Sequence, residues 1–203
     1  MSLIFYYAPM SSATPVQWAL EELGVPYEKV KLDLKAGDTK KPEFLKINPN
    51  GKVPVIVHDG TAIFESVAIQ MYLGETFGVE KGLYPAPGPK RGEAMKWIAW
   101  CNVSAGDAVG RFFRNTSDWT PDDHKNAKAG EVAKADLEAH LRVLDGALEG
   151  KQFMLGDSFS LVDVHLAAWM EYVSMSKVDF APYRSLNAWL QRCQARPAHA
   201  RAE

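Results

Sequence analysis

Two short apolar runs in the first half of the chain, at residues 53–57 and 61–64, are separated by His58-Asp59-Gly60. An Asp-Gly pair between two runs of β-forming residues is typical of a tight hairpin turn. The second run continues through Glu65-Ser66 into apolar positions with helical spacing up to Leu73, and serine is a preferred residue for capping a helix start. The pattern therefore predicts a strand, a turn, a second strand and a helix capped by Ser66.

The pattern before this hairpin predicts a β-α-β unit. Residues 3–7 form a continuous apolar and aromatic run, which is typical of a buried strand. A helix is expected from Thr14, because Thr-Pro-Val-Gln offers an N-cap, a proline in the first turn and a glutamine, and Gly24 would end it. Residues 27–33 alternate between apolar and charged and predict a second strand. A parallel pair joined by a right-handed crossover, together with the hairpin, gives a mixed α/β sheet.

The composition changes near residue 80. Residues 82–89 hold three prolines and two glycines, so we interpret residues 81–89 as a linker. The rest has helical spacing, and the expected helices lie at 90–114, from Thr120-Pro121 to Gly150, from the Ser-x-x-Asp capping box at 160–163 to about 174, and at 183–194. We therefore expect an α/β domain at residues 1–80 and an all-α helical domain at residues 90–203.

Composition and charge narrow the class of protein. The 203 residues are 47% hydrophobic and 24% charged with a net charge of −2, which is ordinary for a soluble globular protein and does not favour a nucleic-acid or anionic-membrane partner. No apolar run approaches the roughly eighteen residues of a membrane span, and the first residues do not resemble a signal peptide. Cys101 and Cys193 lie far apart, and neither they nor the histidines have metal-ligand spacing. We expect a cytoplasmic protein with reduced, buried cysteines and no metal.

Two features of the hairpin region indicate a ligand site in addition to their part in folding. If the Val53-Pro54 bond is cis, Val53 presents its own N–H and C=O to an extended ligand, although a proline that merely starts a strand is the simpler interpretation. Glu65-Ser66 stands at a helix start, where backbone N–H groups and the helix dipole favour an anion, although a plain helix cap explains the same residues. Both features occur on adjoining parts of one small sheet, which favours a ligand site.

Several motifs together resemble those of the glutathione S-transferases. They are Y-A-P-M-S-S-A-T at residues 7–14, N-P-x-G-K-V-P at 48–54, E-S-x-A-I at 65–69 and S-x-x-D at 160–163. The resemblance covers essentially the whole chain and is closest to serine-type, bacterial-like cytosolic members. It implies a thioredoxin-like N-terminal domain, a cis Val-Pro bond, a homodimer, and glutathione as co-substrate with no other cofactor.

The resemblance also implies which residues bind glutathione. The backbone of Val53, next to Pro54, would pair with the cysteinyl part of the tripeptide. Glu65 and Ser66 would form the site of the γ-glutamyl carboxylate. The glycyl carboxylate would be reached by lysines, namely Lys52 and either Lys40 or Lys41, each of which is otherwise a solvated surface charge.

The loop after the first strand would hold the catalytic residue, and here it contains Ser11 and Ser12. A free thiol with a pKa of about 8.5 is only a few per cent ionised at neutral pH, and a hydroxyl that donates to the sulfur favours the thiolate. We place Ser11 before Ser12, because Thr14 is expected to cap the following helix and so to leave Ser11 free for the ligand. Tyr6 or Tyr7 stays possible as the donor, although a tyrosine within a strand is usually a packing residue.

The site for the second substrate is the least clear from the sequence. It should involve the helical domain and the loop residue next to the serines, and the candidates are Met10, Arg111, Phe112 and Trp119, with Phe113 and Arg114 beside them. An aromatic stripe at helical spacing is more often part of a hydrophobic core.

The expected function is transfer of glutathione to small, hydrophobic electrophiles, which is a role in detoxification. An alternative enzyme class is a glutathione-dependent reductase of disulfides or peroxides that uses the same site. The loop holds no cysteine, which argues against disulfide exchange through a thiol of the protein. A non-catalytic interaction module with the same fold is the third possibility, and the intact serine, Val-Pro and Glu-Ser motifs speak against it.

Overall fold

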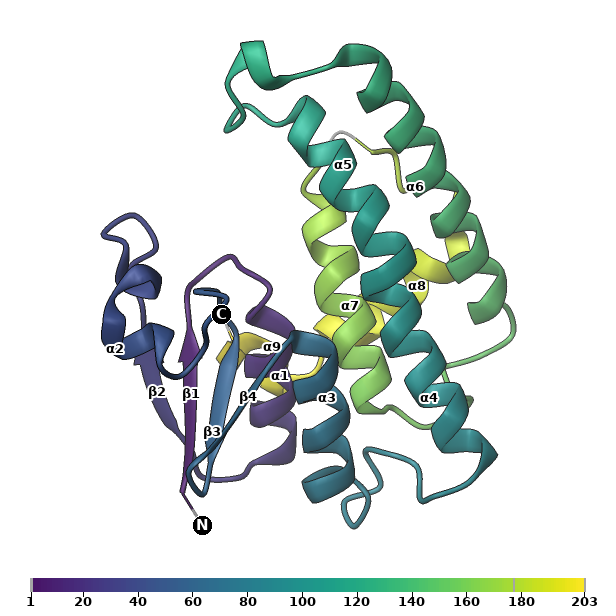
Figure 1. Cartoon of the computed structure of the whole chain (residues 1–203). Coiled ribbons are helices and arrows are strands. Elements are labelled where there is room, and N and C mark those ends of the chain that lie inside the picture. Colours follow the sequence, from purple (N-terminus) through teal and green to yellow (C-terminus); the bar gives the residue numbers. More distant parts are fainter. Residues whose placement is uncertain (1, 177, 203) are drawn as a thin grey trace. The chain divides into compact units, whose positions relative to one another are not determined.

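The computed structural model describes residues 2–176 and 178–202 (Figure 1). These residues divide into two compact units, one formed by residues 2–91 together with 196–202, the other by residues 92–195. The sequence pattern predicted a helical domain of residues 90–203. In the structure the last helix belongs to the first unit instead, because it packs along the first helix of the chain.

A four-stranded mixed sheet forms the centre of the first unit. Its strands are β1 (Leu3–Tyr7), β2 (Glu28–Lys31), β3 (Val55–His58) and β4 (Thr61–Phe64), in the order β2-β1-β3-β4. β1 pairs parallel to β2, while β3 is antiparallel to both β1 and β4. This arrangement confirms the β-α-β unit and the hairpin. β3 begins after Pro54, because proline has no N–H for the ladder.

Helices cover both faces of this sheet (Figure 1). α1 (Thr14–Leu23) and α3 (Ser66–Leu73) lie against one face and contact each other, while the short α2 (Pro42–Leu45), preceded by a 3₁₀ turn at Asp38–Lys40, lies on the other. Consecutive side chains of a strand point to opposite faces. Phe5 is therefore fully buried on one face, and Tyr6 contacts Phe44 of α2 on the other.

Two expected helix caps are displaced by one residue. The N-cap of α1 is Ala13 rather than Thr14, and the Thr14 hydroxyl donates back to the Ser11 carbonyl (3.1 Å). The N-cap of α3 is Glu65, so Ser66 is the first helical residue. Neither helix start is closed by a side-chain cap.

The second unit is helical throughout. Its elements are the greater part of α4 (Pro89–Trp100), a π turn at Cys101–Ala105, α5 (Gly106–Thr116), a 3₁₀ turn at Asp122–His124, α6 (Ala127–Leu148), α7 (Leu161–Ser174) and α8 (Arg184–Gln194). The expected single helix at 90–114 is thus interrupted by a π turn. α6 starts at Ala127 rather than near Thr120, because the Asn126 side chain caps it by accepting from the Ala129 N–H (3.0 Å).

α7 lies in the core of the second unit, as its apolar composition predicted. The expected capping box is present, since the Asp163 carboxylate accepts from the Ser160 N–H (2.9 Å) and the Ser160 hydroxyl (2.8 Å). The same buried carboxylate also accepts from the Met154 N–H and the Trp189 indole N–H. It thereby ties α7 to α8 and to the loop before α7.

The chain continues into α9 (Pro197–Ala202), which the sequence analysis did not predict. Cys101 and Cys193 are buried thiols that form no disulfide, as expected, and burial raises the pKa of the Cys101 thiol. Among the described residues, no helix has the length and apolar character needed to cross a membrane.

Candidate functional site

Three chain segments meet at one edge of the sheet. Tyr6 of β1 is paired with Val55 of β3, and Val55 is in turn paired with Phe64 of β4, both in antiparallel register. The residues that follow β1, precede β3 and follow β4 therefore leave the sheet at the same edge. This edge gathers the loop at 8–13, the Val53-Pro54 dipeptide and the Glu65-Ser66 dipeptide, so the structure brings together the three motifs expected to form the site.

Ser11 is occupied by hydrogen bonds within its own loop. Its hydroxyl donates to the Ala8 carbonyl (2.7 Å), and its Oγ accepts from the Ala13 N–H (3.2 Å). The premise that Thr14 would cap α1 and leave Ser11 free does not hold, because Ala13 is the N-cap and its N–H uses the Ser11 oxygen. A hydroxyl has only one hydrogen to donate, so the Ser11 hydroxyl has to release the Ala8 carbonyl before it can donate to a ligand.

Ser12 lies against the second motif. Its hydroxyl donates to the Val53 carbonyl at 3.1 Å, a contact between residues 41 positions apart, and its side chain is exposed. An exposed hydrogen bond of this kind is cheaply exchanged for one to a ligand. Of the two serines, Ser12 therefore has the hydroxyl better placed to donate a hydrogen bond to a molecule bound alongside Val53.

Val53 has the geometry of a backbone docking point. The Val53-Pro54 peptide bond is cis, as expected, and within the described part of the chain no acceptor is found for the Val53 N–H. The preceding loop is held by the Asn48 side chain, which donates to the Lys52 carbonyl (2.7 Å). Gly51 has φ +59°, and a Cβ there would lie 2.8 Å from the Thr39 carbonyl, so the loop needs glycine at this position.

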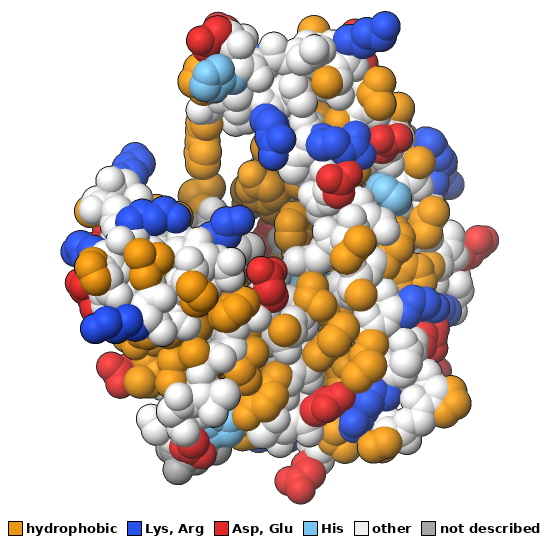
Figure 2. Space-filling model, in the orientation of Figure 1, with side chains coloured by type: hydrophobic (Ala, Val, Ile, Leu, Met, Phe, Trp, Pro, Cys, Tyr) orange, Lys and Arg blue, Asp and Glu red, His pale blue; other side chains and the backbone are white. Residues whose placement is uncertain are grey.

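The three candidate lysines differ in their surroundings. Lys40 Nζ donates to the Gly51 carbonyl (3.1 Å), and Lys41 forms an ion pair with Asp38 (2.7 Å). Lys52 is exposed and has no ion-pair partner in the described structure, which leaves its charge available to an anion. Residues 28–52 hold seven lysines and four carboxylates in a chain of net charge −2, and Figure 2 shows Lys and Arg side chains gathered over the region of α2 and β2.

The start of α3 has an unusual backbone. Glu65 has φ +72° and ψ +118°, a conformation that costs a residue with a side chain about 1–3 kcal/mol and that concentrates at ligand sites. Its carbonyl accepts from the Ile69 N–H (2.9 Å), and its side chain is exposed. Ser66 is buried in the first turn, where the backbone N–H groups are oriented to bind an anion.

Tyr6 and Tyr7 act as packing residues. Tyr6 contacts Phe44 with ring centroids 5.9 Å apart, and Tyr7 stacks on Phe5 at 5.4 Å.

The residues expected at the electrophile site come from both units and differ in their exposure. Met10, in the first unit, is 70% exposed with φ +50°, Trp119 is 82% exposed, and Phe112 is only 4% exposed. Phe112 therefore contributes to the core of the second unit. Phe113, named beside these candidates, stacks on Tyr172 with ring centroids 4.6 Å apart, a contact that the sequence did not indicate. These two residues come from α5 and α7, and no short-range pattern connects them.

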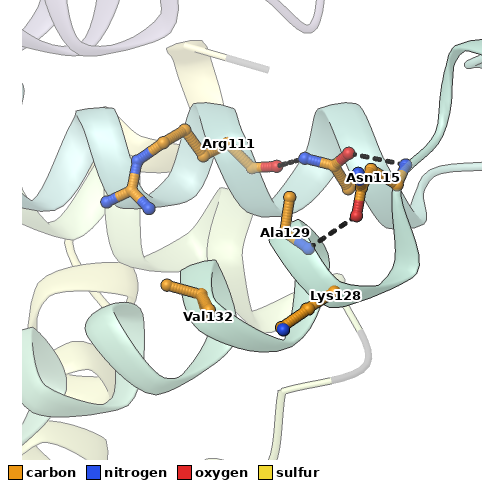
Figure 3. Close-up of a pocket in the computed structure, with 6 residues that line it drawn as sticks. Arg111, Asn115, Lys128, Ala129 and Val132 are labelled. Carbon is orange, nitrogen blue, oxygen red and sulfur yellow. Dashed lines mark hydrogen bonds between the residues drawn. The ribbon is translucent and has the colours of Figure 1, made fainter.

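Arg111 lies on α5 at the rim of an open pocket of about 320 Å³ between α5 and α6 (Figure 3). Its guanidinium donates to Asp107 (2.8 Å) and Asp136 (2.9 Å), and these carboxylates raise its pKa. The other lining residues are Asn115, Asn126, Lys128, Ala129 and Val132. Because Asp107 and Asp136 offset the positive charge of Arg111, this side chain attracts a further anion only weakly.

Comparison with known families agrees with this arrangement. The model of the glutathione S-transferase N-terminal domain matches residues 1–75, and that of the C-terminal domain matches residues 106–197. The chain belongs to the glutathione S-transferase family. Its first unit is accordingly the thioredoxin-like domain of a glutathione S-transferase, and its second unit is the helical domain.

The proteins similar to this chain are named for more than one activity. The disulfide-bond oxidoreductase YfcG of Escherichia coli is 28% identical over 97% of this chain and 92% of its own length. A glutathione transferase from Burkholderia graminis, crystallised with two glutathione molecules per subunit, is 29% identical with a TM-score of 0.88, covering 99% of this chain and 87% of that one. A glutathione transferase from Phanerochaete chrysosporium in complex with oxidized glutathione is 25% identical with a TM-score of 0.90, covering 99% and 94%.

The described residues contain no group of three or more His, Cys, Asp or Glu side chains placed to hold a metal ion.

Proposed function

We propose that the protein binds glutathione at the edge where β1, β3 and β4 meet, and transfers its thiolate to small electrophiles. The observation that supports this best is the Ser12 hydroxyl, 3.1 Å from the Val53 carbonyl at the same sheet edge as Glu65-Ser66. In this proposal one glutathione molecule contacts the Ser12 hydroxyl, the Val53 backbone and the first turn of α3 at the same time.

In this proposal each end of glutathione has a matching partner. The Val53 N–H donates to the cysteinyl carbonyl, and the Val53 carbonyl accepts from the cysteinyl N–H in place of the Ser12 hydroxyl. The first turn of α3, with Ser66, holds the γ-glutamyl carboxylate, while the Glu65 carboxylate accepts from the γ-glutamyl ammonium. Lys52 attracts the glycyl carboxylate, and Lys40 and Lys41 are the further candidates.

The chemistry needs the sulfur as thiolate. Once the Ser12 hydroxyl is released from the Val53 carbonyl, it donates to the sulfur and lowers the pKa of the bound thiol. The thiolate then attacks the electrophilic carbon, the sulfur–carbon bond forms, and the leaving group departs with its electron pair. We propose Ser12 as the donor rather than Ser11, because Ser11 is already bonded twice within its loop.

A second candidate is glutathione-dependent disulfide reduction, supported by the E. coli relative named a disulfide-bond oxidoreductase. The loop at 8–13 holds no cysteine, so the attacking thiolate has to be that of glutathione. It attacks one sulfur of the substrate disulfide and releases the other as a thiolate. A second glutathione thiolate then resolves the mixed disulfide, which gives oxidised glutathione and the second substrate thiol.

One pair of assays on the purified protein distinguishes these functions. Retention on immobilised glutathione tests the binding site, after which an aryl halide and a mixed disulfide of glutathione are offered in parallel as second substrates. Conjugation of the aryl halide with little disulfide reduction is the expected result. Faster turnover of the mixed disulfide would establish the second candidate, and no retention on glutathione would refute both.

Together with this function we propose a homodimer, a cytoplasmic location and a role in detoxification. Light scattering of the purified protein tests the first of them, and a mass of a single chain of 22.5 kDa would contradict it.

A further inference from the structure

The C-terminal residues are bound to α1 by a partly buried ion pair. Arg196, immediately before α9, donates to both carboxylate oxygens of Glu22 at 2.7 Å and 2.6 Å. The Glu22 side chain is only 5% exposed and also accepts from the Trp18 indole N–H (3.2 Å). A bidentate pair of this kind fixes both the distance and the orientation of its partners.

A second contact joins the other ends of the two helices. The Gln17 side chain is buried, and its Nε2 donates to the Ala202 carbonyl at 2.8 Å. Between these two contacts the ring of His199 meets the buried ring of Trp18, with centroids 4.6 Å apart. α9 therefore runs antiparallel to α1 and is fixed to it at both ends (Figure 1).

The helix held in this way is the one that begins at the serine loop. The Gln17 N–H donates to the Ala13 carbonyl (3.0 Å), and both the N–H and the hydroxyl of Thr14 donate to the Ser11 carbonyl (3.1 Å each). α1 has no side-chain cap of its own. The position of Ser12 therefore depends on where the first turn of α1 lies.

We propose that α9 is a clasp that positions the serine loop for the glutathione sulfur, with Gln17 and Arg196 as positioning residues. This inference rests on the proposed function. Apolar contacts alone allow one helix to slide along another, whereas polar contacts near opposite ends of α1 fix its position along the axis. The half-exposed Arg201 adds to them by donating to the Glu21 side chain (3.1 Å) and to the Glu21 carbonyl (3.3 Å). An α-helix rises 1.5 Å per residue, so a slip of less than one residue already moves the Ser12 hydroxyl out of hydrogen-bonding range.

The experiment compares Gln17→Met, which keeps the shape and removes the donor, and Arg196→Lys, which keeps the charge and removes the bidentate geometry. The matched control is Arg192→Lys on α8, an arginine whose guanidinium donates to the Gln152 carbonyl (3.0 Å) and the Lys151 carbonyl (3.4 Å) within the second unit. Four quantities are measured: the melting temperature, the Kd for glutathione, kcat, and the thiolate absorbance of bound glutathione against pH.

We expect Gln17→Met and Arg196→Lys to leave the Kd for glutathione within about twofold, to move the thiol titration to higher pH, and to lower kcat at neutral pH roughly tenfold, as a displacement of the donor predicts. Arg192→Lys should change none of these. A lower melting temperature with an unchanged thiol titration would show that α9 only stabilises the fold and would overturn the proposal.

If Gln17→Met does not fold, Arg196→Lys decides by the same titration. Absence of any thiolate signal in the unmodified protein is a different result, which refutes the proposed function itself.

Discussion

At the scale of single residues, the two neighbouring serines have different hydrogen-bond partners and therefore different expected effects. Ser12→Ala should raise the pKa of bound glutathione and lower turnover at neutral pH about tenfold for each unit of pKa. Part of the rate should return at high pH, where the thiol ionises without help. The measurement is thiolate absorbance of the complex against pH, combined with kcat.

Ser11→Ala is the control for this prediction. It removes two hydrogen bonds of the loop, so the free energy of unfolding should fall by about 1–2 kcal/mol while the thiol titration moves less. The opposite pattern would assign the donor to Ser11, the first choice from the sequence.

Glu65 and Ser66 should matter more for binding than for stability. Glu65→Gln and Ser66→Ala each remove a group that the proposal pairs with the charged γ-glutamyl end, and a charge-assisted hydrogen bond is worth roughly 1.5–3 kcal/mol. Calorimetry should show glutathione affinity reduced about 10- to 100-fold. Glu43→Gln, an exposed glutamate on α2, should leave the affinity unchanged. Wild-type affinity in a folded Glu65→Gln, Ser66→Ala double variant would falsify the assignment.

At the scale of elements, α7 should make stability depend on pH through His165. This side chain is fully buried, its Nε2 lies 2.7 Å from Asn102 Oδ1, and its Nδ1 has no hydrogen-bond partner in the described structure. Burial lowers the pKa of His165 to about 3, from about 6.5 in the unfolded chain. Between these values the unfolded state binds a proton that the folded state does not, so stability is lost as the pH falls below about 6.5.

The expected slope from this residue approaches about 1.4 kcal/mol per pH unit, or about 2 kcal/mol lost by pH 5. Denaturant unfolding at several pH values measures it. His165→Gln should flatten the dependence between pH 6.5 and 5, even if the variant is less stable at every pH. His124→Gln, at an exposed position, should leave the slope unchanged, and an equal slope in both variants would exclude His165 as its source.

At the scale of the whole molecule, the elements predicted best were those defined by contacts within a few residues. The Asp59-Gly60 turn joins the paired residues His58 and Thr61, the Ser160–Asp163 capping box joins residues three positions apart, and both are present. Errors of one residue at Thr14 and of several at Thr120 arose because nearby Ala13 and Asn126 are the actual N-caps.

The contacts that build the candidate site and the clasp join residues far apart in the chain, so no sequence period indicates them. Ser12 meets Val53 across 41 positions, and Gln17 meets Ala202 across 185. The motif resemblance supplied Val53 as a site residue, but the difference between Ser11 and Ser12 became visible only with their hydrogen-bond partners. α9 was missed because its few residues show too little periodicity to predict a helix.

The place of α9 has a consequence for synthesis on the ribosome. The first unit has all its strands by residue 64, yet Trp18 and Glu22 are covered only when residues 196–202 arrive. At about 5–20 residues per second, residues 92–195 of the second unit take on the order of ten seconds to make. During that interval the nascent first unit lacks His199 against the Trp18 ring and Arg196 beside the Glu22 carboxylate, so its packing is completed only after the second unit has been made.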